Sequence, residues 1–146
     1  MKKIIYGIAA TGLIALTAFT TKDEIYKVDT KLSSMDWTGK KLTGEHTGTI
    51  MFTSGEISMA KEEVTGGTFE IDMHSIADMD IKDENWKKKL EGHLKSADFF
   101  DAEKFPKSKF VITSVTPIPA AKEGDFTHHV KGNLTMKDKT NPIEFD

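Results

Sequence analysis

Residues 47–53 have the sequence Thr-Gly-Thr-Ile-Met-Phe-Thr, in which two kinds of side chain alternate. Gly48, Ile50 and Phe52 share one phase, whereas the threonines and Met51 share the other. A period of two residues places successive side chains on opposite faces of a β-strand. The stretch therefore predicts a strand that buries one apolar face.

The same alternation recurs along most of the chain. The apolar phases are Tyr26 and Val28, Met35 and Trp37, Ile57 and Met59, Phe69 to Met73, Phe110 and Ile112, and Phe126 to Met136. Ser54-Gly55 and Gly66-Gly67 have the composition of tight turns, so we expect chain reversals there. This pattern predicts an all-β protein built from antiparallel hairpins.

Residues 83–97 depart from this pattern. Trp86, Leu90, Leu94 and Ala97 recur every three or four positions, which is typical of an amphipathic helix. Asp83 precedes the segment and is a good N-cap residue. We therefore expect one short helix inserted among the strands.

An antiparallel sheet with one apolar face must cover that face, and closure into a barrel also removes exposed edges. A barrel of about eight strands has room for side chains alone or for one small ligand. We found no linker between residues 22 and 146, so residues 21–146 are expected to form one domain. A filled core remains the alternative to a ligand-binding cavity.

The N-terminal residues have the character of a signal peptide. Lys2 and Lys3 precede an uncharged run from Ile4 to Phe19, and small or short polar residues follow. This run is shorter than the roughly 20 apolar residues that span a bilayer. We therefore expect residues 1–20 to be cleaved, no stable membrane span afterwards, and a periplasmic or secreted protein.

Composition argues against several other classes. The formal net charge is -3 and all 20 basic residues are lysines, so no arginine is available to grip phosphate in a bidentate fashion, and we expect no nucleic-acid partner. Cysteine is absent, and no nucleophile elbow, zinc-protease helix or phosphate-binding glycine loop is present. His128 and His129 are adjacent, so on a strand they point to opposite faces and do not share an ion. We expect no enzyme activity, no metal and no cofactor.

Eight segments of the chain, in this order and spacing, carry a resemblance to a known family. The most specific is Leu90-Glu-Gly-His-Leu-Lys-Ser-Ala-Asp-Phe-Phe100. The others are Tyr26 to Asp29, Thr43 to Ile50, Thr65 to Gly67, Ile71 to Ile76, Phe105 to Phe110, Gly132 to Met136 and Asn141 to Ile143. Together they resemble the YceI-like family, bacterial exported proteins whose domain is similar to a lipocalin barrel and binds polyisoprenoids or other long apolar lipids. Family members continue beyond the position of Asp146, so we expect the last barrel strands to be missing from this chain.

Strand phase and this resemblance together predict a ligand site inside the barrel. Its expected apolar lining is Trp37, Ile50, Phe52, Phe69, Ile71, Met73, Phe110, Ile112, Val130 and Leu134, with Leu94, Phe99 and Phe100 at one end. His46 and His128 share the lumen phase and are candidates for contacts with a lipid headgroup, although a hydrogen-bonded histidine near the barrel mouth is the alternative.

The expected function is to bind and sequester or transport a long-chain apolar lipid, such as a polyisoprenoid, an isoprenoid quinone or a fatty amide. Burial of each methylene contributes about 0.8 kcal/mol, so chain length alone can supply affinity. The alternative is a non-enzymatic structural or stress-response interaction module with a filled core. A homodimer is compatible with either function.

Overall fold

The computed structural model describes residues 23–42 and 44–146. The predicted signal peptide, residues 1–20, lies outside the described residues. Within the described part of the chain, no helix combines the length and apolar character that a membrane crossing requires.

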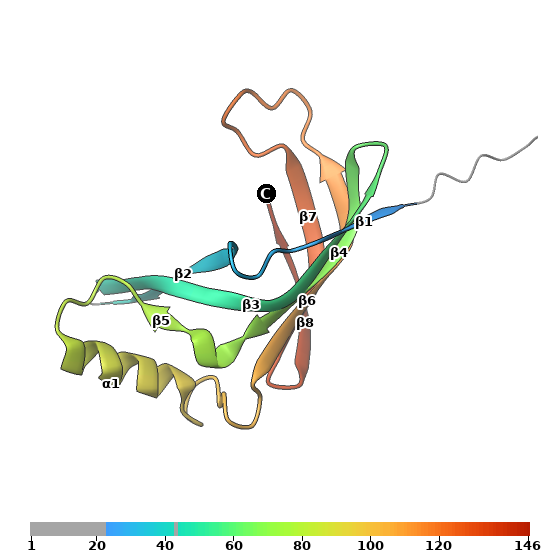
Figure 1. Ribbon diagram of the computed structural model, residues 1–146. Helices are drawn as coiled ribbons and strands as arrows, with labels where there is room; N and C mark the ends of the chain where they lie inside the picture. Colours follow the sequence, from blue (N-terminus) through green and yellow to red (C-terminus); the bar gives the residue numbers. More distant parts are fainter. Residues whose placement is uncertain (1–22, 43) are drawn as a thin grey trace, which may run out of the picture.

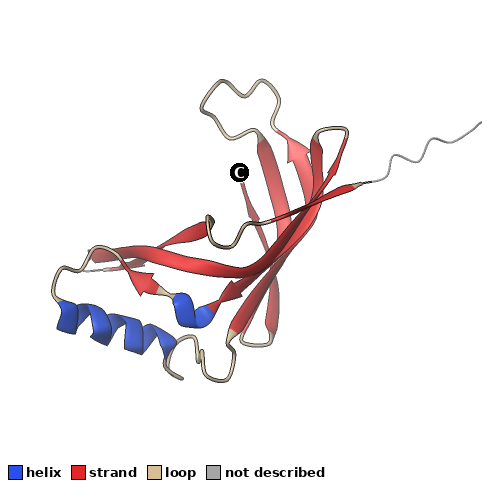
Figure 2. Ribbon diagram, in the orientation of Figure 1, coloured by secondary structure: helices blue, strands red, loops and turns tan. Residues whose placement is uncertain are grey.

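The described residues form a curved antiparallel sheet with one helix at its lower end (Figures 1 and 2). The elements are β1 (Glu24–Lys27), β2 (Ser34–Lys41), β3 (Gly44–Ala60), β4 (Glu63–Asp72), a turn of 3-10 helix (Met73–Ser75), β5 (Ala77–Asp78), α1 (Glu84–Lys95), β6 (Lys107–Pro117), β7 (His128–Met136) and β8 (Lys139–Phe145). The all-β class with one short helix is therefore confirmed.

The sheet is organised around the long strand β3. One half of β3 pairs with β1 and β4, and the other half pairs with β2 and β5. The order continues from β4 through β6 and β7 to β8. Among residues 23–42 and 44–146, no strand pairing joins β8 to β1 or β2, so the expected closed barrel is replaced by an open, curved sheet.

The reversal expected at Ser54-Gly55 was wrong, because β3 runs through it. A register shift lies between Phe52 and Ser54, and the extra residue reverses the side-chain phase. In the sequence, such a phase change looks the same as a turn. The glycine permits close packing instead, since a Cβ on Gly55 would lie 2.6 Å from the Val28 side chain.

The reversal expected at Gly66-Gly67 was also wrong, since both glycines lie within β4. The hairpin between β3 and β4 turns at Lys61 and Glu62, whose φ angles are 51° and 69°. Positive φ at both central residues suits the twist of a two-residue hairpin, but glycine, asparagine or aspartate normally marks such a turn. Lys61 and Glu62 gave no such signal.

Helix α1 agrees with the predicted segment of residues 83–97. The side chain of Asp83 accepts hydrogen bonds from the backbone N–H groups of Asn85 and Trp86, as expected of an N-cap. Leu94 joins the buried core, and Leu90 packs against it. Trp86 is 61% exposed, contrary to its expected place on the apolar face, and Lys89 lies over its ring.

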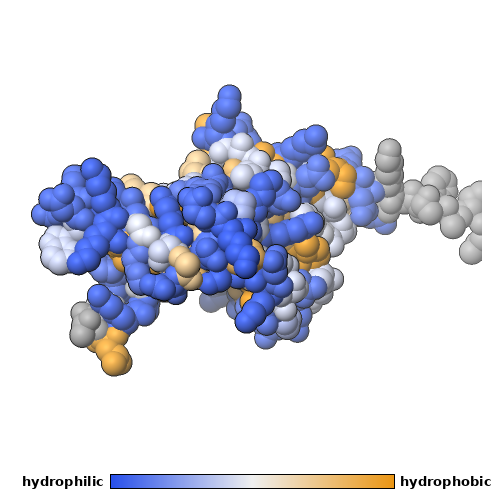
Figure 3. All heavy atoms as spheres, turned by 90° about the horizontal axis from the view of Figure 1, so that it is seen from below, coloured by the Kyte–Doolittle hydropathy of each residue, from blue (hydrophilic) through white to orange (hydrophobic). Residues whose placement is uncertain are grey.

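The buried core lies where the 3-10 turn, α1 and the loop after α1 meet the middle of β3 and the end of β4. Its buried members are Ile50, Ile71, Met73, Ile76, Leu94 and Ala102. Seen from the side of α1, the molecular surface is mostly hydrophilic (Figure 3). The helix therefore shields one end of the apolar sheet face from water.

Candidate ligand-binding cavity

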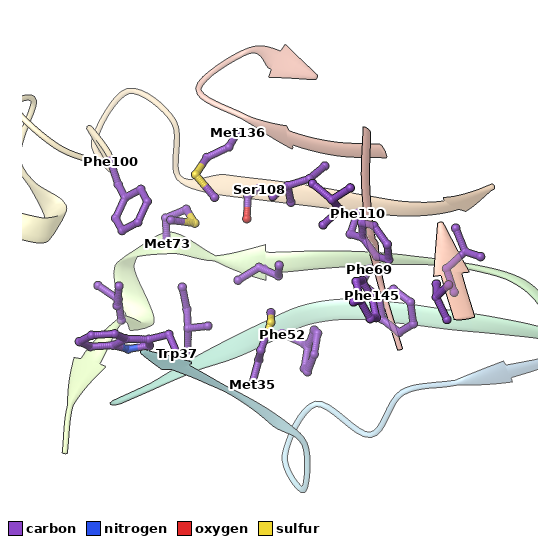
Figure 4. Close-up of a pocket in the computed structure, with 17 residues that line it drawn as sticks. Met35, Trp37, Phe52, Phe69, Met73, Phe100, Ser108, Phe110, Met136 and Phe145 are labelled. Carbon is purple, nitrogen blue, oxygen red and sulfur yellow. The ribbon is translucent and has the colours of Figure 1, made fainter. Parts of the chain in front are cut away.

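The inner face of the sheet bounds a cavity of about 430 Å³ (Figure 4). This volume falls within the range of about 300–1,000 Å³ that is typical of small-molecule sites. Its lining comes from all the long strands, the 3-10 turn and the loop after α1. The lining residues are Met35, Trp37, Ile50, Phe52, Phe69, Ile71, Met73, Ile76, Phe100, Ser108, Phe110, Ile112, Val130, Leu134, Met136, Ile143 and Phe145.

Aromatic side chains bound both ends of the cavity. Trp37 and Phe100 lie toward the end near α1, whereas Phe69, Phe110 and Phe145 gather at the other end (Figure 4). The ring centroids of Phe69 and Phe110 are 6.5 Å apart, and those of Phe110 and Phe145 are 5.7 Å apart. These separations are typical of packed aromatic pairs, so the far end is held by ring contacts between three strands.

Trp37 is fixed in place by hydrogen bonds at the near end. Its indole N–H donates to the backbone carbonyls of Thr49, at 3.3 Å, and Ala77, at 3.2 Å. The ring lies over Gly48, where a Cβ would come within 2.6 Å of the indole. Glycine at this position therefore allows the indole to close that end of the cavity.

Ser108 is the one polar residue in the described lining. It is 2% exposed, and its Oγ has no hydrogen-bond partner among the described residues. In Figure 4 its hydroxyl points into the cavity. A buried hydroxyl without a partner costs about 1–3 kcal/mol, and a polar group that displaced the atoms covering this oxygen would remove that cost.

The structure brings together most of the residues that the sequence pointed to. Of the expected site residues, those that line the cavity are Trp37, Ile50, Phe52, Phe69, Ile71, Met73, Phe100, Phe110, Ile112, Val130 and Leu134. Sequence reasoning missed Met35, Ile76, Ser108, Met136, Ile143 and Phe145. Met35, Met136, Ile143 and Phe145 already stood in apolar phase, and Ser108 stands two residues before Phe110, so strand phase contained the signal for these five.

Leu94 and Phe99 lie outside the cavity lining. Leu94 is buried behind the cavity in the core. Phe99 is 46% exposed, and its ring packs edge-on against Phe100 with centroids 4.7 Å apart. Because adjacent residues in this loop point in different directions, only Phe100 of the pair reaches the cavity.

Neither candidate headgroup histidine lines the cavity. His46 shares a strand face with Ile50, as expected, but it lies beyond the Trp37 indole, which covers Gly48 between them. His128 lies past the other end of the lining on β7, and its Nε2 is 3.3 Å from Oε2 of Glu63. Strand phase gave the correct face for both, but it does not show where along the strand the cavity ends.

His46 instead belongs to a cluster with two aspartates from the segment around β5. Its Nδ1 lies 3.1 Å from Oδ2 of Asp80 and 4.0 Å from Oδ2 of Asp78. The backbone N–H of Thr47 donates to Asp80 Oδ1 at 2.7 Å. This hydrogen bond, followed by the one with His46, lowers the pKa of the Asp80 carboxyl below its usual range.

With the cavity described, comparison with known proteins identifies the family. A model of the YceI-like domain matches residues 26–146, which is most of the chain. The protein belongs to the YceI-like domain family. The resemblance seen in the sequence is therefore confirmed.

The YceI-like chain is also similar to individual curated and solved proteins. It is 30% identical over 148 residues to a UPF0312 protein from Pseudomonas putida, an alignment that covers 99% of this chain and 72% of that relative. A UPF0312 protein from Pseudomonas fluorescens is 45% identical over 51 residues, covering 35% of this chain and 26% of the relative. The crystal structure of Burkholderia cenocepacia BcnA matches with a TM-score of 0.62 and 22% identity over 80% of this chain and 67% of that one. This last similarity supports the fold alone.

Proposed function

We propose that this YceI-like protein binds one long-chain apolar molecule in the cavity of its sheet, as a carrier or sequestering protein and without catalysis. The observation that supports this proposal is the apolar cavity of about 430 Å³, whose described lining holds one polar side chain. Each methylene transferred from water into such a site contributes about 0.8 kcal/mol. A chain of a dozen carbons therefore gains enough to outweigh the several kcal/mol lost on association.

Ser108 favours a ligand that combines a chain with one hydrogen-bonding group. An amide, an alcohol or a quinone carbonyl placed beside Ser108 Oγ would satisfy the hydroxyl that has no partner in the described structure. A pure hydrocarbon would leave it unsatisfied. Polyisoprenols, isoprenoid quinones and fatty amides all meet this requirement, so we propose this group of lipids as the ligand class.

The first experiment tests whether the cavity holds the ligand. Trp86 is exposed and Trp37 lines the cavity, so a Trp86→Phe background leaves Trp37 as the sole tryptophan and reporter. In this background, we expect a series of saturated primary amides to change Trp37 fluorescence, with affinity rising with chain length. No fluorescence change and no bound mass in native mass spectrometry for any member of the series would contradict the proposal.

A matched pair of valine variants locates the site. Val130→Phe places a ring in the cavity, whereas Val111→Phe adds the same ring on β6, where Val111 is outside the lining. We expect Val130→Phe to weaken amide binding by about tenfold or more while Val111→Phe binds as the parent does. Circular dichroism checks that both variants fold, and equal binding by both would place the ligand elsewhere.

Ser108→Ala tests the polar contact separately. Removal of the Ser108 hydroxyl leaves a lining without a polar side chain. A primary amide should therefore lose affinity, by about 0.5–1.5 kcal/mol for one hydrogen bond. An alkane of the same length should bind equally well or better. Equal losses for both probes would argue that the substitution alters packing and not recognition.

We also propose that the protein acts outside the cytoplasm. The support is the sequence of residues 1–20, with Lys2 and Lys3 before an uncharged run. Expression of the whole chain in a bacterial host, followed by cell fractionation and N-terminal sequencing, tests this. Recovery of an uncleaved protein from the cytoplasm would contradict it.

A further inference from the structure

We propose that His46, Asp78 and Asp80 form a binding site for a divalent transition-metal ion, of which Zn²⁺ is the best match. One ligand atom from each residue lies within 4.8 Å of the others. These three residues lie outside the cavity lining, so the proposed ion site does not depend on the ligand proposed above.

The buried carboxylate of Asp78 points to an ion. Asp78 is 0% exposed, and its Oδ2 has no hydrogen-bond partner among the described residues. Its other oxygen accepts the backbone N–H of Ile81 at 2.8 Å, which fixes the carboxylate plane. Burying a carboxylate oxygen without a partner is costly, and a coordinated cation removes that cost.

The three ligand atoms have the spacing that a small ion requires. Two ligands at about 2.0–2.1 Å from zinc in tetrahedral geometry lie about 3.3 Å apart. The separations from His46 Nδ1 are 3.1 Å to Asp80 Oδ2 and 4.0 Å to Asp78 Oδ2, which bracket that value. Ion binding therefore requires the three side chains to draw closer together than they are without the ion, and water would complete the shell.

The types of ligand atom select the class of ion. Imidazole nitrogen favours Zn²⁺ and other transition ions, whereas Mg²⁺ and Ca²⁺ prefer shells made of oxygen alone. One histidine and two carboxylates therefore suit Zn²⁺, and Mn²⁺, which the carboxylates suit but the imidazole does not, should bind more weakly. Each aspartate accepts a hydrogen bond from a backbone amide: Asp78 from Ile81 and Asp80 from Thr47. These bonds orient both carboxylates in the absence of an ion.

An ion in this site would join two parts of the fold that are distant in sequence. His46 belongs to β3, Asp78 to β5, and Asp80 follows β5, and the sequence separation of His46 and Asp80 is 34. Ala77, the neighbour of Asp78, accepts the hydrogen bond from the Trp37 indole that closes the cavity. Metal binding would therefore stabilise the near end of the cavity, and this coupling was invisible in the sequence because the cluster is assembled by tertiary contacts.

The test uses the whole chain, with any affinity tag removed, titrated with ZnCl₂, MnCl₂ and MgCl₂ in separate experiments. We expect one Zn²⁺ per chain by native mass spectrometry, a rise in melting temperature with Zn²⁺, a smaller rise with Mn²⁺, and none with MgCl₂. Absence of stoichiometric Zn²⁺ binding, or an equal response to all three salts, would overturn the proposal.

Variants assign the binding to the cluster. His46→Gln and Asp80→Asn should each weaken Zn²⁺ binding by at least about tenfold. His129→Gln is the matched control, because His129 also contacts two acids. Its Nε2 faces Glu144 and its Nδ1 faces Asp146, so the two carboxylates lie at opposite sides of the ring and one ion cannot bind the imidazole and both of them. Equal weakening by the control, or unchanged binding in His46→Gln and Asp80→Asn, would place the ion elsewhere.

Asp78→Asn separates a metal ligand from a purely structural residue. Because the substitution removes a buried carboxylate oxygen that has no hydrogen-bond partner among the described residues, the metal-free variant should melt at the same temperature as the parent or higher. Its Zn²⁺-dependent rise in melting temperature should disappear. A variant that melts lower without metal yet keeps the rise with Zn²⁺ would show that Asp78 is structural and would contradict its place in the site.

Discussion

The indole nitrogen of Trp37 lies 3.2 Å from the backbone carbonyl oxygen of Ala77. This bond connects β2 with β5, which pair with β3 but not with each other. It holds the indole across the end of the cavity, so one side chain both lines the cavity and fastens the strands around it. Removing the indole should therefore affect stability and ligand binding together.

Trp37→Phe should destabilise the protein by about 1–2 kcal/mol, since it removes the hydrogen bonds to Ala77 and Thr49 and part of the packed ring. Urea unfolding measures this change. Trp86→Phe is the matched control, because Trp86 is exposed, and it should stay within about 0.5 kcal/mol of the parent. Equal effects of the two substitutions would contradict the role assigned to Trp37.

Two glycines should respond to alanine in opposite directions. Gly132 lies against the ring of Phe110, and a Cβ there would come within 2.6 Å of the Val111 carbonyl oxygen, so Gly132→Ala should destabilise by about 1–3 kcal/mol. Gly92 lies inside α1 with nothing within 4 Å of an added Cβ, so Gly92→Ala should stabilise by about 0.5–1 kcal/mol. Thermal and urea unfolding of both variants test the pair, and changes of the same sign would contradict the packing described for β6 and β7.

The ion pair of Glu70 and Lys107 should make a small contribution to the free energy of unfolding that depends on pH. The Lys107 ammonium lies 2.8 Å from Glu70 Oε2, and this hydrogen bond and charge lower the pKa of Glu70 from its usual 4.5. A carboxyl with a lowered pKa in the folded state stabilises that state above about pH 4.5, and this stabilisation is lost as the pH falls through the lower, folded-state pKa.

Comparison of the parent with Glu70→Gln tests this linkage. The free energy of unfolding of the variant should be slightly lower at pH 7, and the difference should vanish in acid. Because both partners are partly exposed, high salt should reduce the difference at pH 7. A difference that is independent of pH would mean that Glu70 acts through packing and not through its charge.

Asp83 should be needed for the stability of α1. Its carboxylate accepts two backbone N–H groups in the first turn, so Asp83→Ala should cost about 1 kcal/mol. Asp83→Asn keeps the accepting oxygen and should cost less, which separates capping from charge. The free energy of unfolding of both variants, from urea denaturation, tests this. If Asp83→Asn lowered it as much as Asp83→Ala does, the charge of the carboxylate and not its hydrogen bonds would dominate.

The amino-acid sequence by itself determined the all-β class, the single short helix with its Asp83 cap and most of the cavity lining. It could do so because strand and helix periodicities are local, and they assign each residue to a face without knowledge of its partners. Ile50, Phe52, Phe69 and Ile71 line the cavity for this reason.

Only the tertiary structure decided where the chain turns, how far the cavity extends and what His46 contacts. The bulge after Phe52 and the reversal at Lys61 and Glu62 depend on how β3 pairs with β4, and no local pattern marked either one. His46 shares the face of Ile50, but Trp37 folds over Gly48 and leaves the imidazole beside Asp78 and Asp80. Periodicity fixes the direction of a side chain, whereas its surroundings are set by residues brought from elsewhere in the chain.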